Sequence, residues 1–369
     1  MKLPLLTASL FCLTTAAHAC DLCACELPSV RLEPRAGWHA GVAEQFTDYG
    51  RLQDSGRGIS NPAGQYMHSS ITQIYAGYDF APTFGVQLNV PYIARTFRRV
   101  ENGTLENGTE SGFGDISLIG SWTALRMERG DFRLTMRVNA GIKLPTGDSS
   151  RLREEGEHEH GHEEEKVFVP EVSENVTRRV NTGTFVEVNG TFIPVFRTET
   201  QKVIVTPAHF EEEEHHEDEE PSGVHGHDLA LGTGSLDGVF GADVSCQWKR
   251  AFFEAGLQYT LRGDGLHSYD FADDLSWHAG GGFVLLQSEG WNAALGVRFS
   301  GETKSEDEFR GARLDDTGIT TVFVGPRLAV TAGEQLSVNV GIDFPIRRDN
   351  SGVQTVPDYR VQGGVSWQF

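Results

Sequence analysis

Histidine gathers at two acidic stretches of the chain, and imidazole is the commonest protein ligand for transition metals. The windows 158–162 and 215–227 hold seven of the twelve histidines that follow residue 19. These candidate metal ligands are His158, His160, His162, His215, His216, His225 and His227. Residues i and i+2 of an extended chain project to the same side, so the first window can offer three imidazoles to one ion. The pattern predicts weak capture of Zn, Cu or Ni, with no cofactor required.

The same stretches hold most of the excess negative charge. The formal net charge is −21, and residues 154–165 and 211–220 contain seven and eight acids, so the rest of the chain has a net charge of −6. A negative field concentrates cations, which favours a metal-collecting segment. The alternative is a solvated acidic loop whose histidines are incidental. An acidic chain with scattered Arg residues argues against nucleic-acid binding.

Residues 1–19 are typical of a removable secretion signal. Lys2 precedes an apolar stretch, and Ala17-His18-Ala19 has the small-x-small pattern of a cleavage site. The mature chain is expected to begin at residue 20, in the cell envelope. Beyond the signal, no apolar run approaches the roughly 18 residues that a membrane helix needs.

Four cysteines remain after removal of the signal: Cys20, Cys23, Cys25 and Cys246. In an oxidising compartment such residues pair as disulfides, which is one interpretation. A second is a soft-metal site for Cu(I) or Zn(II), because three of the sulfurs lie within six residues. A third is acylation of Cys20. We take residues 20–36 as a periplasmic Cys-rich segment.

Strict alternation of apolar and polar residues indicates β-strands with one face towards lipid and one towards a polar lumen. Segments of this kind lie near 37–47, 68–80, 85–96, 113–124, 131–144, 235–248, 251–262, 275–286, 291–300, 318–330, 335–345 and 358–369. The last segment alternates from Tyr359 to Trp367 and Phe369. A final strand with a terminal aromatic residue resembles the signal that the barrel assembly machinery of Gram-negative bacteria recognises.

The connections between these segments alternate between short and long, as in outer-membrane barrels. The short ones are 81–84, 125–130, 249–250, 287–290 and 331–334, and 346–357 is among the long ones. The sequence thus predicts an all-β fold, a transmembrane antiparallel up-and-down β-barrel of about 12 strands over 37–369, in outer-membrane lipid. Residues 146–234 are expected to form a His/Glu-rich extracellular loop. Within it, Asn189-Gly190 predicts a β-hairpin; as wall strands instead, its two arms would give 14 strands.

Charged residues on the other phase of the strands are predicted to line the lumen and set its selectivity. They are Arg133, Arg137, Lys143, Asp243, Glu254, His278, Arg298, Arg327, Asp343 and Arg360. The excess of Arg argues against simple diffusion of a free divalent cation. It leaves room for an anionic or chelated metal.

Two Gly-rich stretches flank the long insertion, Gly141-Ile142-Lys143-Leu144-Pro145-Thr146-Gly147-Asp148 and Leu231-Gly232-Thr233-Gly234-Ser235-Leu236-Asp237-Gly238. Together with the alternation, they resemble the outer-membrane transporters of the "MetA pathway of phenol degradation" group, distant relatives of long-chain fatty-acid channels. The resemblance covers residues 37–369. It implies a passive channel for small, hydrophobic molecules without catalytic residues. The Cys-rich segment and the His/Glu-rich insertion depart from that pattern.

Three functions remain open. The first is an outer-membrane channel or transporter linked to transition-metal capture or transport. The second is a channel of the same fold for a small hydrophobic or aromatic solute. The third is a non-transporting surface barrel that sequesters metal. Ser268 beside His267 and Asp270 is only a superficial catalytic candidate, so we expect no enzyme.

Overall fold

The computed structural model describes residues 36–101, 103–155, 166–169, 172–188, 191–206, 209–212 and 221–369. The predicted signal peptide and the segment with Cys20, Cys23 and Cys25 lie outside the described residues. So do five of the candidate metal ligands, namely His158, His160, His162, His215 and His216. Among the described residues, no helix is long and apolar enough to cross a membrane.

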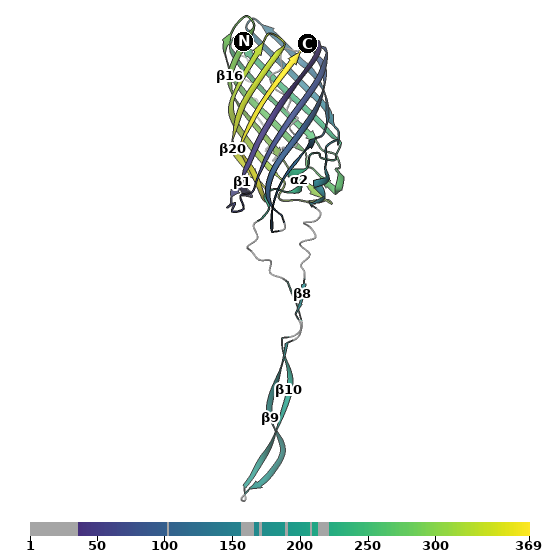
Figure 1. Ribbon diagram of the computed structural model, residues 1–369, viewed down its shortest axis with the longest axis vertical. Helices are drawn as coiled ribbons and strands as arrows, with labels where there is room; N and C mark the ends of the chain where they lie inside the picture. Colours follow the sequence, from purple (N-terminus) through teal and green to yellow (C-terminus); the bar gives the residue numbers. More distant parts are fainter. Residues whose placement is uncertain are drawn as a thin grey trace, which may run out of the picture. The chain divides into compact units, whose positions relative to one another are not determined.

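Twelve long antiparallel strands form the wall of a closed barrel in the part of the chain that the structure describes (Figure 1). The barrel closes because β1 pairs with both β21 and β3. The wall strands are β1 (Gly37–Asp54), β3 (Tyr66–Ala81), β4 (Phe84–Glu101), β6 (Ser117–Arg129), β7 (Phe132–Lys143), β12 (Asp237–Trp248), β13 (Ala251–Leu261), β15 (Asp274–Gln287), β16 (Trp291–Lys304), β19 (Ile319–Ala332), β20 (Leu336–Asn350) and β21 (Val353–Gln368). Each overlaps one predicted segment, so the prediction of a 12-stranded transmembrane barrel is confirmed.

Side chains alternate between the two faces of the wall, which is the physical basis of the sequence pattern. On β3, Ser69, Ile71 and Gln73 are buried inside the barrel, whereas Ile74 and Phe80 are exposed on its outer face. The outer face is apolar all round, as a lipid-facing surface requires. Backbone N–H and C=O groups cannot bond to water within the lipid. Because the barrel is closed, each wall strand pairs with a neighbour on both sides there.

Five connections at one end of the barrel are short turns, at 82–83, 130–131, 249–250, 288–290 and 333–335. They confirm the predicted short connections. The start of β1 and the end of β21 also lie at this end of the barrel. They are joined there by the backbone N–H of Phe369, which donates to the carbonyl of Trp38 at 2.8 Å. We call this the short-turn end and the opposite one the long-loop end; the latter is extracellular in outer-membrane barrels.

The prediction of a long connection at 346–357 is wrong. β20 and β21 continue until only Ser351 and Gly352 join them, with Gly352 at φ 54° in the turn. Likewise β4 runs on to Glu101 and pairs there with β5 (Thr104–Phe113). Strand pairing does not stop where the apolar alternation stops, because polar side chains suit a strand that extends into water.

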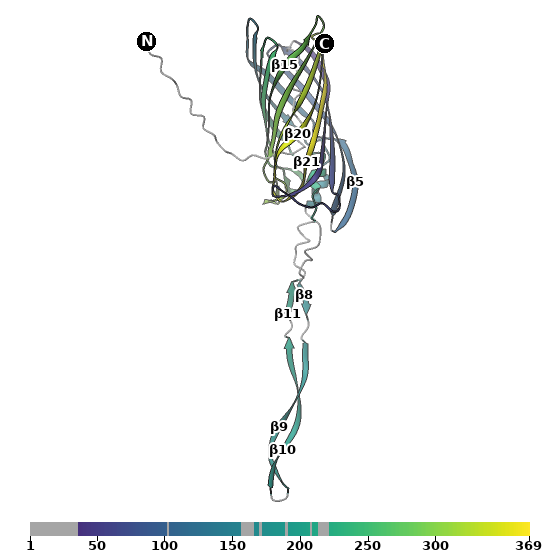
Figure 2. The same ribbon diagram turned by 90° about the vertical axis from the view of Figure 1, so that its left-hand side faces the viewer.

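The shorter strands of the barrel unit lie in its connections. β2 (Arg57–Gly58) extends the pairing of β1, and β14 (Tyr269–Asp270), β17 (Glu308–Phe309) and β18 (Ala312–Arg313) form a small separate sheet. Residues 157–219 form a second compact unit. In that unit β9 (Val172–Val188) pairs with β10 (Thr191–Thr206), and β8 (Lys166–Val169) pairs with β11 (His209–Glu212) (Figure 2). The predicted hairpin is therefore confirmed, and its strands are not wall strands.

Candidate functional site

The two ends of the long insertion fold into the barrel mouth at the long-loop end. We call residues 144–155 and 221–236 the plug; it contains the 3-10 helix η2 (Ser150–Arg153) and the single-turn helix α2 (Gly226–Leu229). In Figure 1, α2 lies within the lower end of the barrel. The sequence predicts an external loop over the whole of 146–234. The structure instead buries its two ends, and the side chains of Leu152, Val224 and Leu229 are 0% exposed.

Apolar contacts hold the plug against one side of the wall. Val224 and Leu229 form a buried cluster with Tyr49 of β1, Met67 of β3 and Phe97 of β4. Complete burial of a Val or Leu side chain contributes about 1.5–3 kcal/mol. These contacts therefore favour the docked plug by several times the thermal energy.

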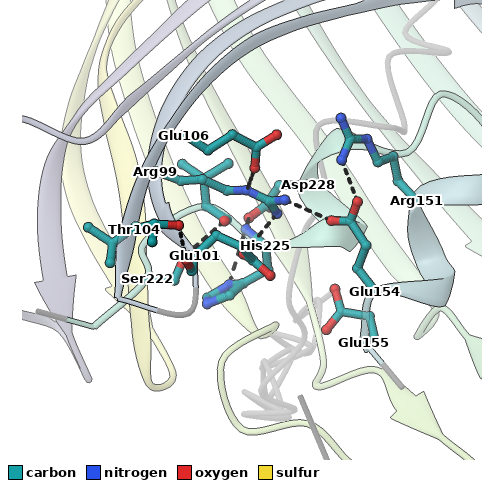
Figure 3. Close-up of polar contacts among 12 residues, drawn as sticks. Arg99, Glu101, Thr104, Glu106, Arg151, Glu154, Glu155, Ser222, His225 and Asp228 are labelled. Carbon is teal, nitrogen blue, oxygen red and sulfur yellow. Dashed lines mark hydrogen bonds and ion pairs between the residues drawn. The ribbon is translucent and has the colours of Figure 1, made fainter. Parts of the chain in front are cut away.

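Arg99 of β4 is the main charged contact between wall and plug (Figure 3). Its side chain is 2% exposed, and its guanidinium donates to Glu106 at 2.7 Å and to Glu154 of the plug at 2.9 Å. Arg151 of η2 pairs with Glu154 and with Glu110 of β5. A buried guanidinium requires such compensation, because removal of one partner leaves an unpaired buried charge.

Backbone groups of the plug are also bound by wall side chains. Arg95 donates from Nη1 to the carbonyl of Ala230 at 2.6 Å. Gln65 donates from Nε2 to the carbonyl of Pro221 at 2.8 Å, while its Oε1 accepts from the N–H of Gly223 at 2.9 Å. Buried backbone groups need partners of this kind, and here the wall supplies them.

The two Gly-rich motifs meet each other at the base of the plug. A Cβ added to Gly147 would lie 2.6 Å from the carbonyl oxygen of Leu231, and one added to Gly232 would lie 2.6 Å from the carbonyl carbon of Gly147. The N–H groups of Leu231 and Gly232 both donate to the carbonyl of Asp148, at 2.9 and 3.0 Å. Glycine is required here because two backbones approach closely.

Lys143 and Asp237, which flank the plug in the sequence, pair with other residues of the wall strands and their connections. Lys143 pairs with Asp237 at 2.9 Å and with Asp115 at 3.5 Å. Arg262 pairs with Asp237 at 2.8 Å and with Asp274 at 2.7 Å. All five side chains are almost completely buried, and the two cations compensate all but one of the three carboxylate charges.

His227 lies in α2 and His225 is its N-cap residue, and both are buried, unlike the solvated histidines that the sequence predicted. His227 contacts Glu155 through Nδ1 at 2.9 Å and Asp228 through Nε2 at 3.5 Å. His225 lies 3.4 Å from Asp316 through Nε2. Burial lowers the pKa of His227, but the charges of Asp228 and Glu155 outweigh it and raise that pKa. Burial raises the pKa of Glu155, but the charge of His227 outweighs it and lowers that pKa.

All ten predicted lumen residues lie on the inner face of the wall. Cross-strand partners share a face, so the pairings carry this assignment round the barrel, from Arg137 opposite Asp243 to Asp343 opposite Arg360. Their role in selectivity stays a prediction. The lumen has fewer available charges than the sequence suggested, because Arg327 pairs with Asp343 and Arg360 pairs with Glu302.

Other lumen positions show how the wall makes room for polar side chains. Asn139 donates to Asp243 at 2.6 Å. Gly256 lies beside Asp243 and His278, whose atoms would lie 2.5 and 2.6 Å from an added Cβ. The glycine thus lets two predicted lumen residues lie over its backbone.

The sequence did not identify the residues that hold the plug. Glu154 and Glu155 belong to an acidic run, which is typical of a solvent-exposed segment. Gln65 and Arg99 lie outside the predicted strands, in segments expected to be long connections. Their partners are 55 to 158 residues away in the chain. The one local signal was the pair of Gly-rich motifs, since glycine at matched positions can indicate a close approach of two backbones.

Comparison with known proteins supports the fold. No family model and no curated protein match the sequence. An outer membrane channel from Pseudomonas putida has a TM-score of 0.53 to this chain at 12% identity, with 93% of this chain and 100% of the other covered. The β-domain of the Bordetella autotransporter BrkA (TM-score 0.39, 10% identity, 90% and 100% covered) and the monoaromatic hydrocarbon channel CymD (0.35, 8%, 91% and 89%) are less similar, and we draw nothing from them. The chain therefore has the fold of an outer-membrane channel, as its sequence resemblance implied.

Proposed function

We propose that this protein is an outer-membrane channel for small solutes whose outer mouth is closed by the plug. The observation that carries the proposal is the docked plug itself. It lies inside a barrel with an apolar outer face and a polar inner face, so solute passage at that end requires the plug to move. In this proposal the protein binds and passes solutes without catalysis.

The charges of the inner face favour small polar solutes of low charge. On the inner face, Arg327 of β19 pairs with Asp343 of β20, and Arg360 of β21 pairs with Glu302 of β16. A lumen whose charged side chains are ion-paired offers hydrogen bonds to a solute but little net electrostatic field. We therefore expect weak selectivity between anions and cations. The hypothesis of transition-metal capture or transport involves Cys20, Cys23, Cys25 and five histidines that lie outside the described part of the chain, and it stays a prediction.

Single-channel recording in planar bilayers tests this function. Replacement of residues 150–229 by a short Gly/Ser linker removes most of the plug, and the contact of Asp148 with Leu231 shows that the two ends can be joined. Deletion of residues 157–219 alone is the matched control, because it retains the plug. We expect large, long-lived openings in the first variant and brief openings in the control and the wild type.

Two results would overturn the proposal. Absence of conductance in all three proteins would favour the non-transporting surface barrel. Equal conductance in all three would show that the plug does not control passage.

A hydrophobic or aromatic solute is the second candidate, and one observation favours it. β4 pairs with β6 only over Phe84–Asn89, and from Tyr92 onwards it pairs with β5. Among the described strands, β5 has no partner on its other side. The wall is therefore discontinuous beside the plug, where an apolar solute could leave sideways. Uptake of an aromatic compound into liposomes, compared with uptake of a small sugar, separates the two candidates.

A further inference from the structure

Two imidazoles and a carboxylate converge at the inner end of the plug. One ligand atom from each of His225, His227 and Asp228 lies within 4.8 Å of the others. The two rings stack with centroids 5.4 Å apart and an interplanar angle of 23°. The His227 Nε2 to Asp228 Oδ1 distance of 3.5 Å is close to the spacing of neighbouring ligands around a tetrahedral ion with bonds of about 2.0–2.1 Å. Figure 3 shows His225 and Asp228 turned towards each other.

Glu155 fixes the orientation of the second imidazole. It lies 2.9 Å from Nδ1 of His227 and also accepts the backbone N–H of His227 at 2.7 Å. Nε2 is the atom that faces Asp228, and a metal ion that binds Nε2 replaces the proton that this nitrogen otherwise shares with the carboxylate. Metal-binding histidines are held in this way by a carboxylate on their second nitrogen.

The first imidazole supplies the independent sign of a ligand. His225 is 8% exposed, and its Nδ1 has no hydrogen-bond partner among the described residues. It lies 4.0 Å from Oδ2 of Asp228. A buried ring nitrogen without a partner costs free energy, and a metal ion between it and Asp228 would recover that cost.

Charge around the cluster favours a cation. Glu155, Asp228 and Asp316 all lie within 3.5 Å of one of the two rings. The nearby Lys304 is ion-paired with Asp307, which reduces its repulsion of a bound ion. Three carboxylates around two imidazoles are suited to a divalent ion of intermediate softness.

We propose that His225, His227 and Asp228 form a binding site for a divalent transition metal such as Zn(II), with Glu155 as the positioning residue. The site is distinct from weak capture by an exposed loop, because it is buried and its ligands are already gathered. All three ligands lie in residues 225–228, and Glu155 of the other arm of the plug contacts His227, so a bound ion favours the conformation in which the two arms pack together. This gating consequence rests on the proposed channel function, whereas the site itself does not.

Spectroscopy with Co(II) as the probe tests the site in the full-length protein. Co(II) in a site with nitrogen and oxygen ligands and low coordination number gives visible absorption far stronger than hydrated or loop-bound Co(II). We expect one equivalent to bind with this signal and to be displaced by Zn(II). In the Asp228→Asn variant we expect affinity to fall at least tenfold, and in Glu155→Gln to fall about 10- to 100-fold.

The matched control is His68→Gln, which alters a His–carboxylate pair elsewhere, His68 with Asp48 at 3.4 Å. It should leave the signal unchanged. Asp228→Asn keeps the acceptor for the backbone N–H of His225, so the plug should still dock, and resistance to proteolysis checks this. A wild-type protein without the signal, or a signal that survives both substitutions, would overturn the site.

Channel recordings separate this inference from the proposed function. We expect Zn(II) to shorten openings in the wild type and to have no effect in Asp228→Asn. Binding without any conductance would leave the site intact and overturn the channel. Conductance with bound Zn(II) but unchanged openings would overturn only the gating consequence.

Discussion

The Nη2 atom of Arg99 lies 2.9 Å from Oε2 of Glu154, and this contact joins wall strand β4 to the plug. The two residues are 55 positions apart, and one belongs to the barrel while the other belongs to the insertion. Docking of the plug therefore adds a third carboxylate, beside those of Glu101 and Glu106, to a buried cation in the wall. We therefore expect the free energy of plug docking to depend on this contact.

Replacement of Arg99 by Gln should release the plug. The substitution removes a buried partner of Glu106 and Glu154, at a cost of about 3 kcal/mol to docking. We expect longer channel openings and faster proteolysis within residues 144–155. Arg126→Gln is the control, because Arg126 forms an exposed pair with Glu128 that contributes little. Unchanged openings in Arg99→Gln would contradict the role of this contact.

The contact between the Gly-rich motifs should not tolerate a side chain. Gly232→Ala places a Cβ against the backbone of Gly147, so docking should weaken by about 1–3 kcal/mol. Gly290→Ala is the matched control, since a Cβ there meets nothing within 4 Å. Proteolytic release of the plug measures the effect. Equal release rates in the two variants would show that the approach relaxes without cost.

A disulfide between plug and wall should hold the mouth closed. The N–H of Thr355 donates to the carbonyl of Gly223 at 2.7 Å, so the two backbones are adjacent. A side chain at Gly223 would meet Cδ1 of Leu52 at 2.1 Å, so Leu52 is first changed to Ala and the native cysteines to Ser. In that background, Gly223→Cys with Thr355→Cys should lower conductance when oxidised. Reduction should restore it. Either single cysteine substitution serves as the control. Equal conductance of the double variant before and after reduction would argue against a moving plug.

The lumen pair should influence both stability and selectivity. Asp343 is 0% exposed and accepts from Arg327, so Arg327→Gln leaves a buried carboxylate and should cost about 3 kcal/mol of unfolding free energy. The reversal potential should shift towards cations. Adding Asp343→Asn should recover much of both effects. Arg347→Gln, at an exposed pair with Asp349, should leave the reversal potential unchanged.

The terminal aromatic residue should matter for assembly rather than for the folded state. Phe369 is 71% exposed, so Phe369→Ser removes little packing. We propose that the barrel assembly machinery recognises it, and we expect a lower yield of folded barrel in vesicles that contain this machinery. Phe253→Ser, at another lipid-facing aromatic residue, controls for lost apolar surface. Equal yields would contradict the recognition role.

The barrel could be predicted from the sequence because its strands follow a local rule. Alternation from Phe132 to Lys143 indicates both the strand and the face of each side chain, without reference to any other strand. The predicted connection 346–357 failed for the same reason. The alternation of lipid-facing residues ends there, but the pairing of β20 with β21 does not.

The candidate site could not be predicted in the same way. Its contacts join residues such as Gln65 and Gly223, 158 positions apart, and no local pattern encodes them. His225 and His227 have the same residue type as His215 and His216, and the four lie within thirteen residues of sequence. Only the contacts of His227 with Glu155 and of His225 with Asp316 show that these two residues are buried.

The sequence by itself determined the strands, their faces, the short turns and the apolar belt, because a membrane imposes a period of two on every segment that crosses it. Only the tertiary structure decided that the ends of the insertion fold inward as a plug. It also decided that Arg99 meets Glu154 and that His225 and His227 lie beside Asp228. These outcomes depend on which charges become buried together, and burial is a property of the closed barrel and not of any segment in it.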